Sequence, residues 1–489
     1  MKNTFVRYLL LITSGFIYTA SFSPFDFKIG IFISLFIYFY LISDSSRKSS
    51  ILESYIYGLA IFTSGVSWIF NSIYYYGGQH LLFSTLMTVI FILLMSIFFI
   101  PIGFFINKKK VMPNIYYPAI AASIWVCMEF LRSTLFGGFP WLLAGTSQVG
   151  TFLNYLYPLL GVYFVSFMIV LIIMMILIIF LSDTKKYILT IYSFILIFIF
   201  SVTITIPSFL TDSKEPLRMT IIQPNIHLGI KFDDKQLATI KDKYIQAMDN
   251  NIHELVILPE TAIPKIYQFD KSFYEAFKQD YNVNLITGIF NFNREDNKIY
   301  NSLLMLNNDN ENFYNKRHLV PFGEYTPLKN VFSFLAEIID IPMSNISHGQ
   351  LNQNKLIYKN VLIHPLICYE IAYPSLIETS NDYGIIINLS NDAWFGDSFA
   401  PYQHLQIAQT RALESGRPVI RVANTGISAV VDKNGVIISK IALNEEGYIN
   451  TNIYPSRGIT PYMYFGDYPL LMLIFTIILL YLNYYRKYG

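Results

Sequence analysis

Cysteine, histidine and charged residues are all scarce in this chain. Two cysteines and seven histidines occur in 489 residues, and only 14% of the residues are charged, whereas a soluble domain carries about 25%. Two cysteines, of which Cys127 lies in an apolar segment, exclude a disulfide framework. The histidines show no zinc-ligand spacing, so neither a metal nor a cofactor is expected. A net charge of +2 gives no indication of a nucleic-acid partner.

Hydrophobic residues are abundant and make up 53% of the chain. Seven apolar segments precede residue 208 and an eighth lies near the C-terminus. Most approach or exceed the ~20 residues that cross a hydrocarbon core, although the second is short. The first has basic flanks but a poor cleavage region, so an uncleaved anchor is expected. The expected helices are Phe5–Phe22, Lys28–Ser43, Ile51–Phe70, Leu81–Ile106, Tyr116–Leu135, Leu153–Leu181, Tyr187–Pro207 and Tyr468–Tyr485.

Basic residues predict the orientation of these helices, because short cytoplasmic loops are enriched in lysine and arginine. With eight crossings, nearly all loop lysines and arginines fall on one side, and Arg132 is the exception. The region between the seventh and eighth helices is therefore expected outside the cytoplasm. The residues on the basic side are Lys2, Arg7, Arg47, Lys48, Lys108, Lys109, Lys110, Lys185, Lys186, Arg486 and Lys487.

Between Leu217 and Tyr454 the composition changes to that of a water-soluble domain. Charged residues become common and apolar runs shorten to strand length, and strands alternating with helices favour one α/β layered domain. The expected boundaries are 1–207 for the first seven helices, 217–455 for this domain and 466–486 for the last helix. The expected strands are Met219–Gln223, Leu255–Leu258, Asn284–Ile289, Leu303–Asn307, Val361–Ile367, Ile385–Leu389, Pro418–Val422, Ser428–Val431 and Val436–Ile438, and the expected helices are Asp234–Ile252, Lys271–Gln279 and His404–Ser415.

Three strand ends in this domain carry residues suited to acyl transfer, namely Glu260, Lys316 and Cys368. A thiol attacks only as its thiolate, so it needs a base or a positive neighbour. Glu260 could accept the thiol proton, and Lys316 could stabilise the thiolate and then an oxyanion. The backbone N–H of Tyr369 would be a second oxyanion donor. Each residue also has an ordinary structural interpretation. Cys368 would then be a small buried thiol, Glu260 a solvated loop carboxylate, and Lys316 one half of a surface charge pair with Arg317.

Longer strings resemble known families. Pro259-Glu260, Lys316 and Cys368-Tyr-Glu370 resemble the Glu-Lys-Cys site of the nitrilase, or carbon–nitrogen hydrolase, superfamily. The chain is further similar, from its first helix to its last, to the apolipoprotein N-acyltransferase family. That resemblance is carried by Asn315–Pro327, Pro342-Met-Ser, Cys368-Tyr-Glu-Ile, Ser390–Gly396, Gly426-Ile and, in the apolar part, Trp125…Glu129…Arg132…Trp141…Gln148.

The resemblance implies a fold of eight transmembrane helices with an extracytoplasmic nitrilase-like domain, an αββα sandwich. It also implies that an acyl chain passes from a phospholipid of the phosphatidylethanolamine type to Cys368 as a thioester. The chain then passes to the α-amino group of an N-terminal diacylglyceryl-cysteine, the last step of lipoprotein maturation. Glu260 would be the general base, Lys316 the oxyanion stabiliser and Cys368 the nucleophile.

Supporting and substrate-binding residues follow from the same resemblance. Glu324 would orient Lys316, Glu370 would brace the thiol region, and Tyr369 follows the nucleophile as in the family. Phe232 and Trp394 would bind substrate, although the family usually carries tryptophan where this chain has Phe232. The implied protein is a monomer in the bacterial inner membrane, with its catalytic domain on the periplasmic side.

Two other functions are compatible with the residues. A membrane-tethered amide or nitrile hydrolase would use the same site but resolve the thioester with water. A transporter or scaffold could carry a nitrilase-like domain that has lost its activity, but an intact Glu260, Lys316 and Cys368 argues against it. For Glu129 and Arg132, a structural role at a helix end or a role in shaping the substrate path is favoured over a direct role in the chemistry.

Overall fold

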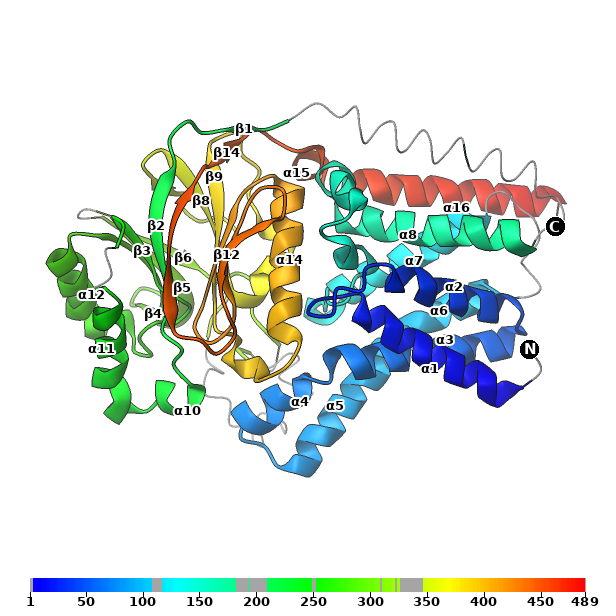
Figure 1. Cartoon of the computed structure of the whole chain (residues 1–489), viewed down its shortest axis with the longest axis horizontal. Helices are drawn as coiled ribbons and strands as arrows, with labels where there is room; N and C mark the ends of the chain where they lie inside the picture. The colour runs from blue at the N-terminus through cyan, green and yellow to red at the C-terminus, as the bar shows by residue number, and fades with distance from the viewer. Residues whose placement is uncertain are drawn as a thin grey trace. The chain divides into compact units, whose positions relative to one another are not determined.

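The structure is a computed structural model that describes residues 3–107, 117–181, 193, 209–248, 252–307, 310–321, 323–325 and 346–488. The chain divides into two compact units (Figure 1). One comprises Met1–Phe70, Leu82–Ser208 and Thr460–Gly489, and the other comprises Asn71–Leu81 and Phe209–Ile459. The expected helix Tyr187–Pro207, apart from residue 193, and the Pro342-Met-Ser string lie outside the described residues.

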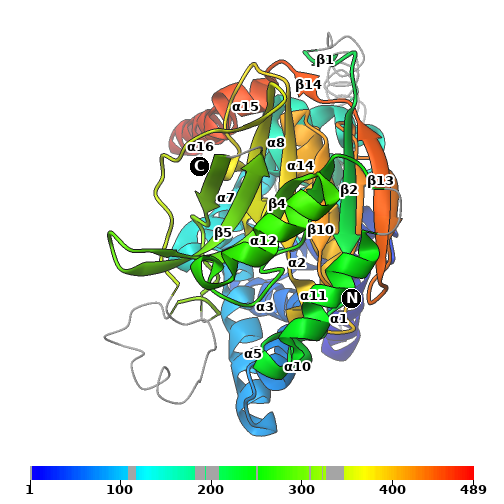
Figure 2. The same ribbon diagram turned by 90° about the vertical axis from the view of Figure 1, so that its left-hand side faces the viewer.

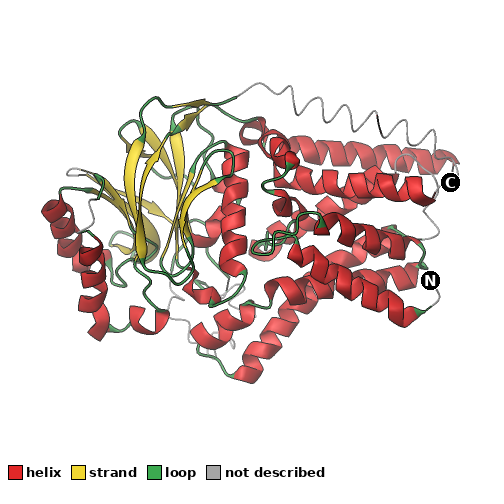
Figure 3. Cartoon of the chain, in the orientation of Figure 1, coloured by secondary structure: helices red, strands yellow, loops and turns green. Residues whose placement is uncertain are grey.

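The first unit is helical and the strands lie in the second (Figure 3). The apolar segments of the first unit are rich in leucine, isoleucine and phenylalanine and are seldom interrupted by polar residues. Such segments favour continuous helices, whose backbone N–H and C=O groups bond to one another. The α-helices that the structure describes in this unit are α1 (Thr4–Ala20), α2 (Gly30–Ser43), α3 (Arg47–Val66), α4 (Ile69–Asn71), α5 (Leu81–Ser96), α6 (Ile100–Phe105), α7 (Tyr117–Thr134), α8 (Tyr157–Leu181), α15 (Pro461–Phe465) and α16 (Tyr468–Tyr488). The π-helix η1 (Ser72–Tyr76) belongs to the second unit.

Several of these helices are apolar enough for a membrane. Among the described residues, Leu81–Phe105, Tyr117–Gly137 and Phe152–Leu181 are long and apolar enough to cross one. A fourth span results if the bent pair Arg47–Val66 and Ile69–Tyr75, which meet at 54°, is counted as one crossing. Thr4–Ala20, Gly30–Ser43 and Tyr468–Asn483 are apolar but shorter. A membrane protein with several apolar helices is thus supported, and the number eight stays a prediction.

Glu129 and Arg132, near the end of α7, hold the irregular chain that follows this helix. The Glu129 Oε1 atom accepts hydrogen bonds from Trp125 Nε1 at 2.9 Å and from the Ala144 backbone N–H at 2.8 Å. Arg132 Nη1 donates to the Trp141 carbonyl oxygen at 2.5 Å. Because both side chains bind backbone groups of the same segment, they favour the structural role at a helix end.

Arg7 also has a partner that the sequence does not reveal. It was expected among the basic flanking residues, yet it lies inside α1 and is buried. Its Nε donates to Glu53 Oε1 of α3 at 2.9 Å, and its Nη2 donates to the Leu41 carbonyl oxygen at 2.7 Å. A buried charge is costly unless it is paired, so this contact ties α1 to α3.

The second unit contains two β-sheets. The six-stranded sheet has the order β13-β2-β3-β4-β5-β6, and the eight-stranded sheet runs β1-β14-β9-β10-β11-β12, with β8 paired to β9 and β7 to β8. The strands are β1 (Thr211–Asp212), β2 (Leu217–Gln223), β3 (Leu255–Ile257), β4 (Asn284–Asn293), β5 (Lys298–Asn307), β6 (Asn310–Asn315), β7 (Leu356–Tyr358), β8 (Val361–Ile367), β9 (Gly384–Ser390), β10 (Val419–Ala423), β11 (Ser428–Val431), β12 (Ile437–Ile441), β13 (Gly447–Ile453) and β14 (Ser456–Arg457).

The two sheets pack face to face with helices on their outer faces. One buried cluster joins both sheets, with Ile221 and Ile286 from the first and Ile387 and Val422 from the second. A second cluster lies between the six-stranded sheet and the helices α11 (Leu237–Ala247) and α12 (Tyr267–Tyr281), which Figure 2 shows in front of it. Helix α14 (Ala400–Ser415) lies against β10 and β11. The domain is therefore layered α-β-β-α.

The expected strands of this domain are confirmed, with bounds that differ by a few residues. Helix Asp234–Ile252 was predicted too long, because α11 ends at Ala247. Helix Lys271–Gln279 was predicted too short, because α12 runs from Tyr267 to Tyr281. Strands β6, β7 and β13 and the two-residue strands β1 and β14 were not predicted. Strand β6 has only two apolar residues, Phe313 and Tyr314, among six, so its alternation is too weak to distinguish it from a loop.

Candidate active site

Cys368 lies directly after β8, in a sharp turn of the chain. The preceding Ile367 is aligned with Leu389 of the parallel strand β9. Cys368 itself has a φ of +53°, in the left-handed region that residues with a side chain rarely adopt, and such local strain is concentrated at functional sites. Asn388 Nδ2 donates to the carbonyl oxygens of Leu366 and Cys368, both at 3.2 Å. A side chain of the neighbouring strand thus holds the turn.

Glu260 lies in a second turn, beyond the end of β3. It is 5% exposed, and Thr261 after it has a φ of +48°. Gly288 of β4 lies against this turn: a Cβ atom at Gly288 would be 2.5 Å from the Glu260 Cα atom. The backbone of Gly288 donates to the Pro259 carbonyl oxygen at 3.1 Å and accepts from Ala262 at 2.9 Å. Only glycine permits this close approach, so Gly288 fixes the position of the carboxylate.

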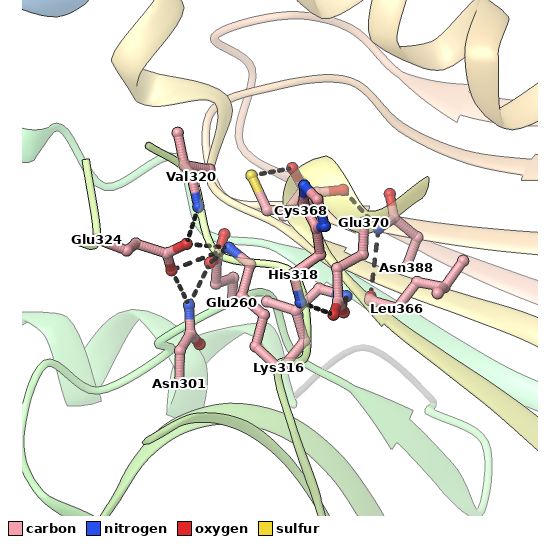
Figure 4. A network of polar contacts seen from close by, with 12 residues as sticks. Glu260, Asn301, Lys316, His318, Val320, Glu324, Leu366, Cys368, Glu370 and Asn388 are labelled. Carbon is pink, nitrogen blue, oxygen red and sulfur yellow. Dashed lines mark hydrogen bonds and ion pairs between the residues drawn. The ribbon is translucent and has the colours of Figure 1, made fainter. Parts of the chain in front are cut away.

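Lys316 follows β6 and lies between two buried carboxylates. Its Nζ is 2.8 Å from Glu324 Oε2 and 3.8 Å from Glu260 Oε1, and the lysine side chain is 1% exposed. The same Glu324 Oε2 atom also accepts a hydrogen bond from the Val320 backbone N–H at 2.9 Å. This is the geometry that an orienting role of Glu324 requires. Figure 4 shows these side chains in one polar cluster with Cys368.

Asn301 connects the two carboxylates, and the sequence did not single it out. Its Nδ2 donates to Glu260 Oε1 at 2.7 Å and to Glu324 Oε1 at 3.0 Å. The backbone carbonyl oxygen of Asn301 accepts the backbone N–H of Lys316 at 2.8 Å. Asn301 is completely buried in β5. A fully buried amide in an apolar strand needs polar partners, which is the signal that could have found it.

The charges of the site follow from burial and from these contacts. Burial raises the pKa of Glu260, an effect that Lys316 opposes and Glu324 increases. Burial alone would lower the pKa of Lys316, but Glu324 and Glu260 outweigh it and hold that pKa above its usual value. Burial and the nearby Glu260 raise the pKa of the Cys368 thiol to about 12, against the effect of Lys316. The resting site therefore holds a neutral thiol beside a charged lysine.

A base must consequently take the thiol proton during the attack. A carboxylate whose pKa is raised is a better proton acceptor than an ordinary one, and Glu260 has this property. The charged Lys316 ammonium supplies positive charge for a thiolate or an oxyanion. The arrangement can therefore support nucleophilic attack by sulfur without histidine or a metal ligand in these roles.

Glu370 joins the cysteine turn to the lysine loop. Its carboxylate accepts the backbone N–H of Ile367 at 2.8 Å, of Arg317 at 2.7 Å and of His318 at 3.0 Å. The Tyr314 hydroxyl donates to it at 3.1 Å. Burial raises the pKa of Glu370, and the backbone donors oppose this effect. One carboxylate thus binds both segments that carry Lys316 and Cys368, as the expected bracing role requires.

Replacing Glu370 with glutamine is expected to destabilise the protein. A glutamine oxygen cannot accept every bond that the carboxylate accepts, and each buried donor left without a partner costs about 1–3 kcal/mol. We expect the midpoint of thermal unfolding in detergent to fall. Glu446, whose exposed carboxylate contacts Lys243, provides the control, because an exposed Glu446→Gln change is expected to stay within about 0.5 kcal/mol. Equal midpoints for the two variants would refute a bracing role.

Phe232 and Trp394, the predicted substrate-binding residues, lie in different loops. Phe232 follows the short helix Leu228–Lys231 and is 37% exposed, so it is available to a ligand. The neighbouring Lys231 is fully buried and donates to the Glu260 carbonyl oxygen at 3.1 Å. Burial lowers the pKa of Lys231 to about 8, against the effect of Glu260. Trp394 is half-buried, and its carbonyl oxygen accepts a hydrogen bond from Ser72 Oγ at 2.8 Å.

Tyr369 belongs to an aromatic cluster next to the cysteine. Its ring centroid is 5.3 Å from that of Tyr373 and 6.2 Å from that of His318. The rings of His318 and Tyr373 are closer, at 3.8 Å. The residue that follows Cys368 therefore packs against the same loop that carries Lys316.

Family models match both parts of the chain. A carbon-nitrogen hydrolase model matches residues 218–459, so the sheet domain is of the carbon–nitrogen hydrolase class. A CN-hydrolase superfamily protein from Xanthomonas campestris is 20% identical with a TM-score of 0.38, covering 49% of this chain and 90% of its own. The apolipoprotein N-acyltransferase N-terminal domain matches residues 14–175.

Full-length relatives are more specific. The apolipoprotein N-acyltransferase of Pasteurella multocida is 31% identical, over 96% of this chain and 93% of the relative. That of Coxiella burnetii is 33% identical, over 96% of this chain and 99% of the relative. The chain belongs to the apolipoprotein N-acyltransferase family.

Proposed function

We propose that this chain transfers an acyl chain from a phospholipid to Cys368, and from the resulting thioester to the α-amino group of an N-terminal diacylglyceryl-cysteine of a lipoprotein. Family membership supports acyltransferase activity in lipoprotein maturation. Glu260 is the general base, Lys316 stabilises the oxyanion and Cys368 is the nucleophile. The observation that carries these roles is the contact of Lys316 Nζ with both Glu324 and Glu260, in a cluster that includes Cys368.

The steps follow from the charges of the groups. Glu260 takes the thiol proton as sulfur attacks the ester carbonyl of the phospholipid, and Lys316 stabilises the oxyanion with the Tyr369 backbone N–H. The lysophospholipid leaves with a proton returned by Glu260. The acceptor amine then attacks the thioester, Glu260 takes an amine proton, and the Cys368 thiolate leaves and is reprotonated. Such a ping-pong route suits two bulky lipids, which need not bind together.

The setting of the reaction is part of the proposal. Both substrates are anchored in a bilayer, and eight transmembrane helices, with residues 217–455 between the last two, would hold the site at the membrane surface. The distribution of basic loop residues supports a periplasmic location for this domain, at the bacterial inner membrane. Phe232 and Trp394 line the substrate path, the acyl donor is of the phosphatidylethanolamine type, and the protein acts as a monomer without a cofactor.

Intact-mass spectrometry of the full-length protein tests this function. After mixing with phosphatidylethanolamine in detergent, the protein should gain the mass of one fatty acyl group, and a Cys368→Ala variant should not. Adding a diacylated peptide with a free α-amine should remove the adduct and yield the triacylated peptide. An N-acetylated peptide of the same sequence should leave the adduct in place.

The same experiment separates the alternatives. A membrane-tethered hydrolase would release free fatty acid at one rate with either peptide or with none, and that outcome would reject N-acyl transfer. A scaffold with a disused domain would show no adduct, and its activity would be indifferent to Cys368→Ser.

A further inference from the structure

A row of polar side chains lies beside the nucleophile, on the outer face of the eight-stranded sheet. Along β9, Ile385, Ile387 and Leu389 belong to the core between the sheets. Because successive residues of a strand point to opposite faces, Asn388 and Ser390 point to the other face, which α14 covers. Arg421 of β10 is aligned with Asn388 and lies on that face as well. All three polar residues are completely buried.

These side chains form one network with Asp392 and His404. Arg421 Nη2 is 2.5 Å from Asp392 Oδ2, and its Nη1 is 2.5 Å from Asn388 Oδ1. His404 Nδ1 is 3.1 Å from Asp392 Oδ1 and 3.0 Å from Arg421 Nη2. Burial alone would raise the pKa of Asp392, but Arg421 and His404 outweigh it and hold that pKa below its usual value. Asp392 is therefore a stable buried carboxylate.

Ser390 connects this network to the reactive sulfur. Its hydroxyl lies 2.7 Å from Asp392 Oδ1 and 3.7 Å from Cys368 Sγ, and Arg421 Nη2 donates to its oxygen at 3.3 Å. A serine hydroxyl has one proton, so it can serve only one of the two acceptors at a time. The carboxylate is the stronger acceptor while sulfur is a neutral thiol, and this changes once sulfur is charged.

We propose that the Ser390 hydroxyl is a further catalytic group, which turns from Asp392 to the Cys368 sulfur whenever that sulfur becomes a thiolate. This inference rests on the proposed function, because it assigns Ser390 a place in the same reaction. Asp392 can release the hydroxyl because Arg421 and His404 still bind it. The Arg421 contact keeps the serine oxygen in place while its proton moves between acceptors.

The hydroxyl acts twice in each cycle and forms no covalent bond. When Glu260 removes the thiol proton, Ser390 donates to the thiolate. When sulfur bonds to the acyl carbon, its charge is lost and the hydroxyl returns to Asp392. When the amine displaces the thioester, the thiolate leaves and Ser390 donates to it again. A donor that favours only the charged sulfur lowers the barrier of both steps.

Charged groups from several elements act on this sulfur. Glu260 after β3 and Lys316 after β6 interact with it electrostatically, as does Asp392 after β9. His404 of α14 interacts with the Cys368 backbone. Glu370 accepts the backbone N–H of Ile367, and Arg421 binds Asn388, whose amide donates to the Cys368 carbonyl oxygen. A thiolate with two neighbouring carboxylates and one lysine gains from an additional donor, and Ser390 is placed to provide it.

The rate of Cys368 alkylation by iodoacetamide, measured against pH in the full-length protein, tests the inference. A Cys127→Ala background leaves a single thiol to react. Below the thiol pKa the rate follows the thiolate fraction, and a hydrogen bond to a charged group shifts a pKa by about one unit, so Ser390→Ala should lower the rate at a given pH about tenfold. Access to sulfur cannot explain a decrease, because alanine is smaller than serine. Ser390→Thr, which keeps the hydroxyl, should retain most of the rate.

Ser428→Ala is the matched control, since Ser428 is a completely buried serine of β11 whose hydroxyl binds Gln223 Oε1 at 2.6 Å. Its alkylation profile should match that of the parent protein. A Ser390→Ala alkylation profile that coincides with that of the parent protein would overturn the inference. If the alanine variant does not fold, Ser390→Gly, which also lacks the hydroxyl, replaces it in the same measurement. Alkylation needs no lipid substrate, so the proposed function fails separately, through absence of the acyl adduct on the parent protein.

Discussion

Replacing Glu260 with glutamine is expected to abolish the acyl adduct on Cys368. Glutamine keeps the size of the side chain and the hydrogen bond from Asn301, but it cannot accept the thiol proton. Loss of a general base lowers a rate by about 10²–10⁴-fold, and here the thiol has a pKa of about 12 and does not ionise unaided. Intact-mass spectrometry after mixing with phospholipid measures the adduct, and an acylated Glu260→Gln variant would contradict the assignment.

The pH dependence gives a second measurement on the same residue. Glu260 works as a base only when ionised, so the rate of adduct formation should rise as the pH rises through its pKa and be lost below it. Burial raises that pKa, so the rise should lie above the usual value of about 4.3 for glutamate. Glu254→Gln is the control, because the exposed Glu254 precedes the same strand and contacts only the surface residue Lys359 among the ion pairs described. It should keep both the rate and the pH profile.

Replacing Lys316 with methionine is expected to affect activity and stability together. Removing one donor to an oxyanion lowers a rate by about 10²–10³-fold, and Lys316 also offsets the charges around the thiolate. Its loss leaves Glu260 and Glu324 buried without their cation, and breaking a buried ion pair costs about 3–5 kcal/mol. Initial rates of peptide acylation and thermal unfolding in detergent measure the two effects.

A double variant separates the catalytic effect from the structural one. Adding Glu324→Gln to Lys316→Met removes one uncompensated charge, so the unfolding midpoint should recover in part while activity stays lost. Lys355→Met is the surface control: Lys355 pairs with Glu378, both about half exposed, and such pairs contribute about 0–1 kcal/mol. Recovery of activity in the double variant would show that Lys316 acts only through the fold.

The strand ends that carry Glu260 and Cys368 could be predicted from the chain alone. Pro259-Glu260 and Cys368-Tyr369 directly follow short apolar runs, and such runs indicate buried strands whatever their neighbours are. The basic loops and long apolar segments likewise depend on adjacent residues only. Strand β6, which precedes Lys316, was missed because its residues are mostly polar, although the lysine itself was identified as a candidate.

The partners of these residues could not be predicted in this way. Asn301 lies on β5 and reaches Glu260 because β4 pairs with both β3 and β5. Ser390 lies beside Cys368 only because β8 and β9 are parallel with Ile367 opposite Leu389. A shift of one residue in that register would turn Ser390 to the opposite face of the sheet. The ion pair of Arg7 with Glu53 depends in the same way on the packing of α1 against α3.

The sequence by itself therefore determined the apolar segments, the apolar strands and the side chains that follow those strands, because these depend on residues that are neighbours along the chain. Only the tertiary structure decided that Lys316 lies between Glu260 and Glu324, and that Arg421, Asp392 and Ser390 extend to the sulfur of Cys368. Strand order and register bring these side chains together across long stretches of sequence, and no local pattern encodes a contact of that kind.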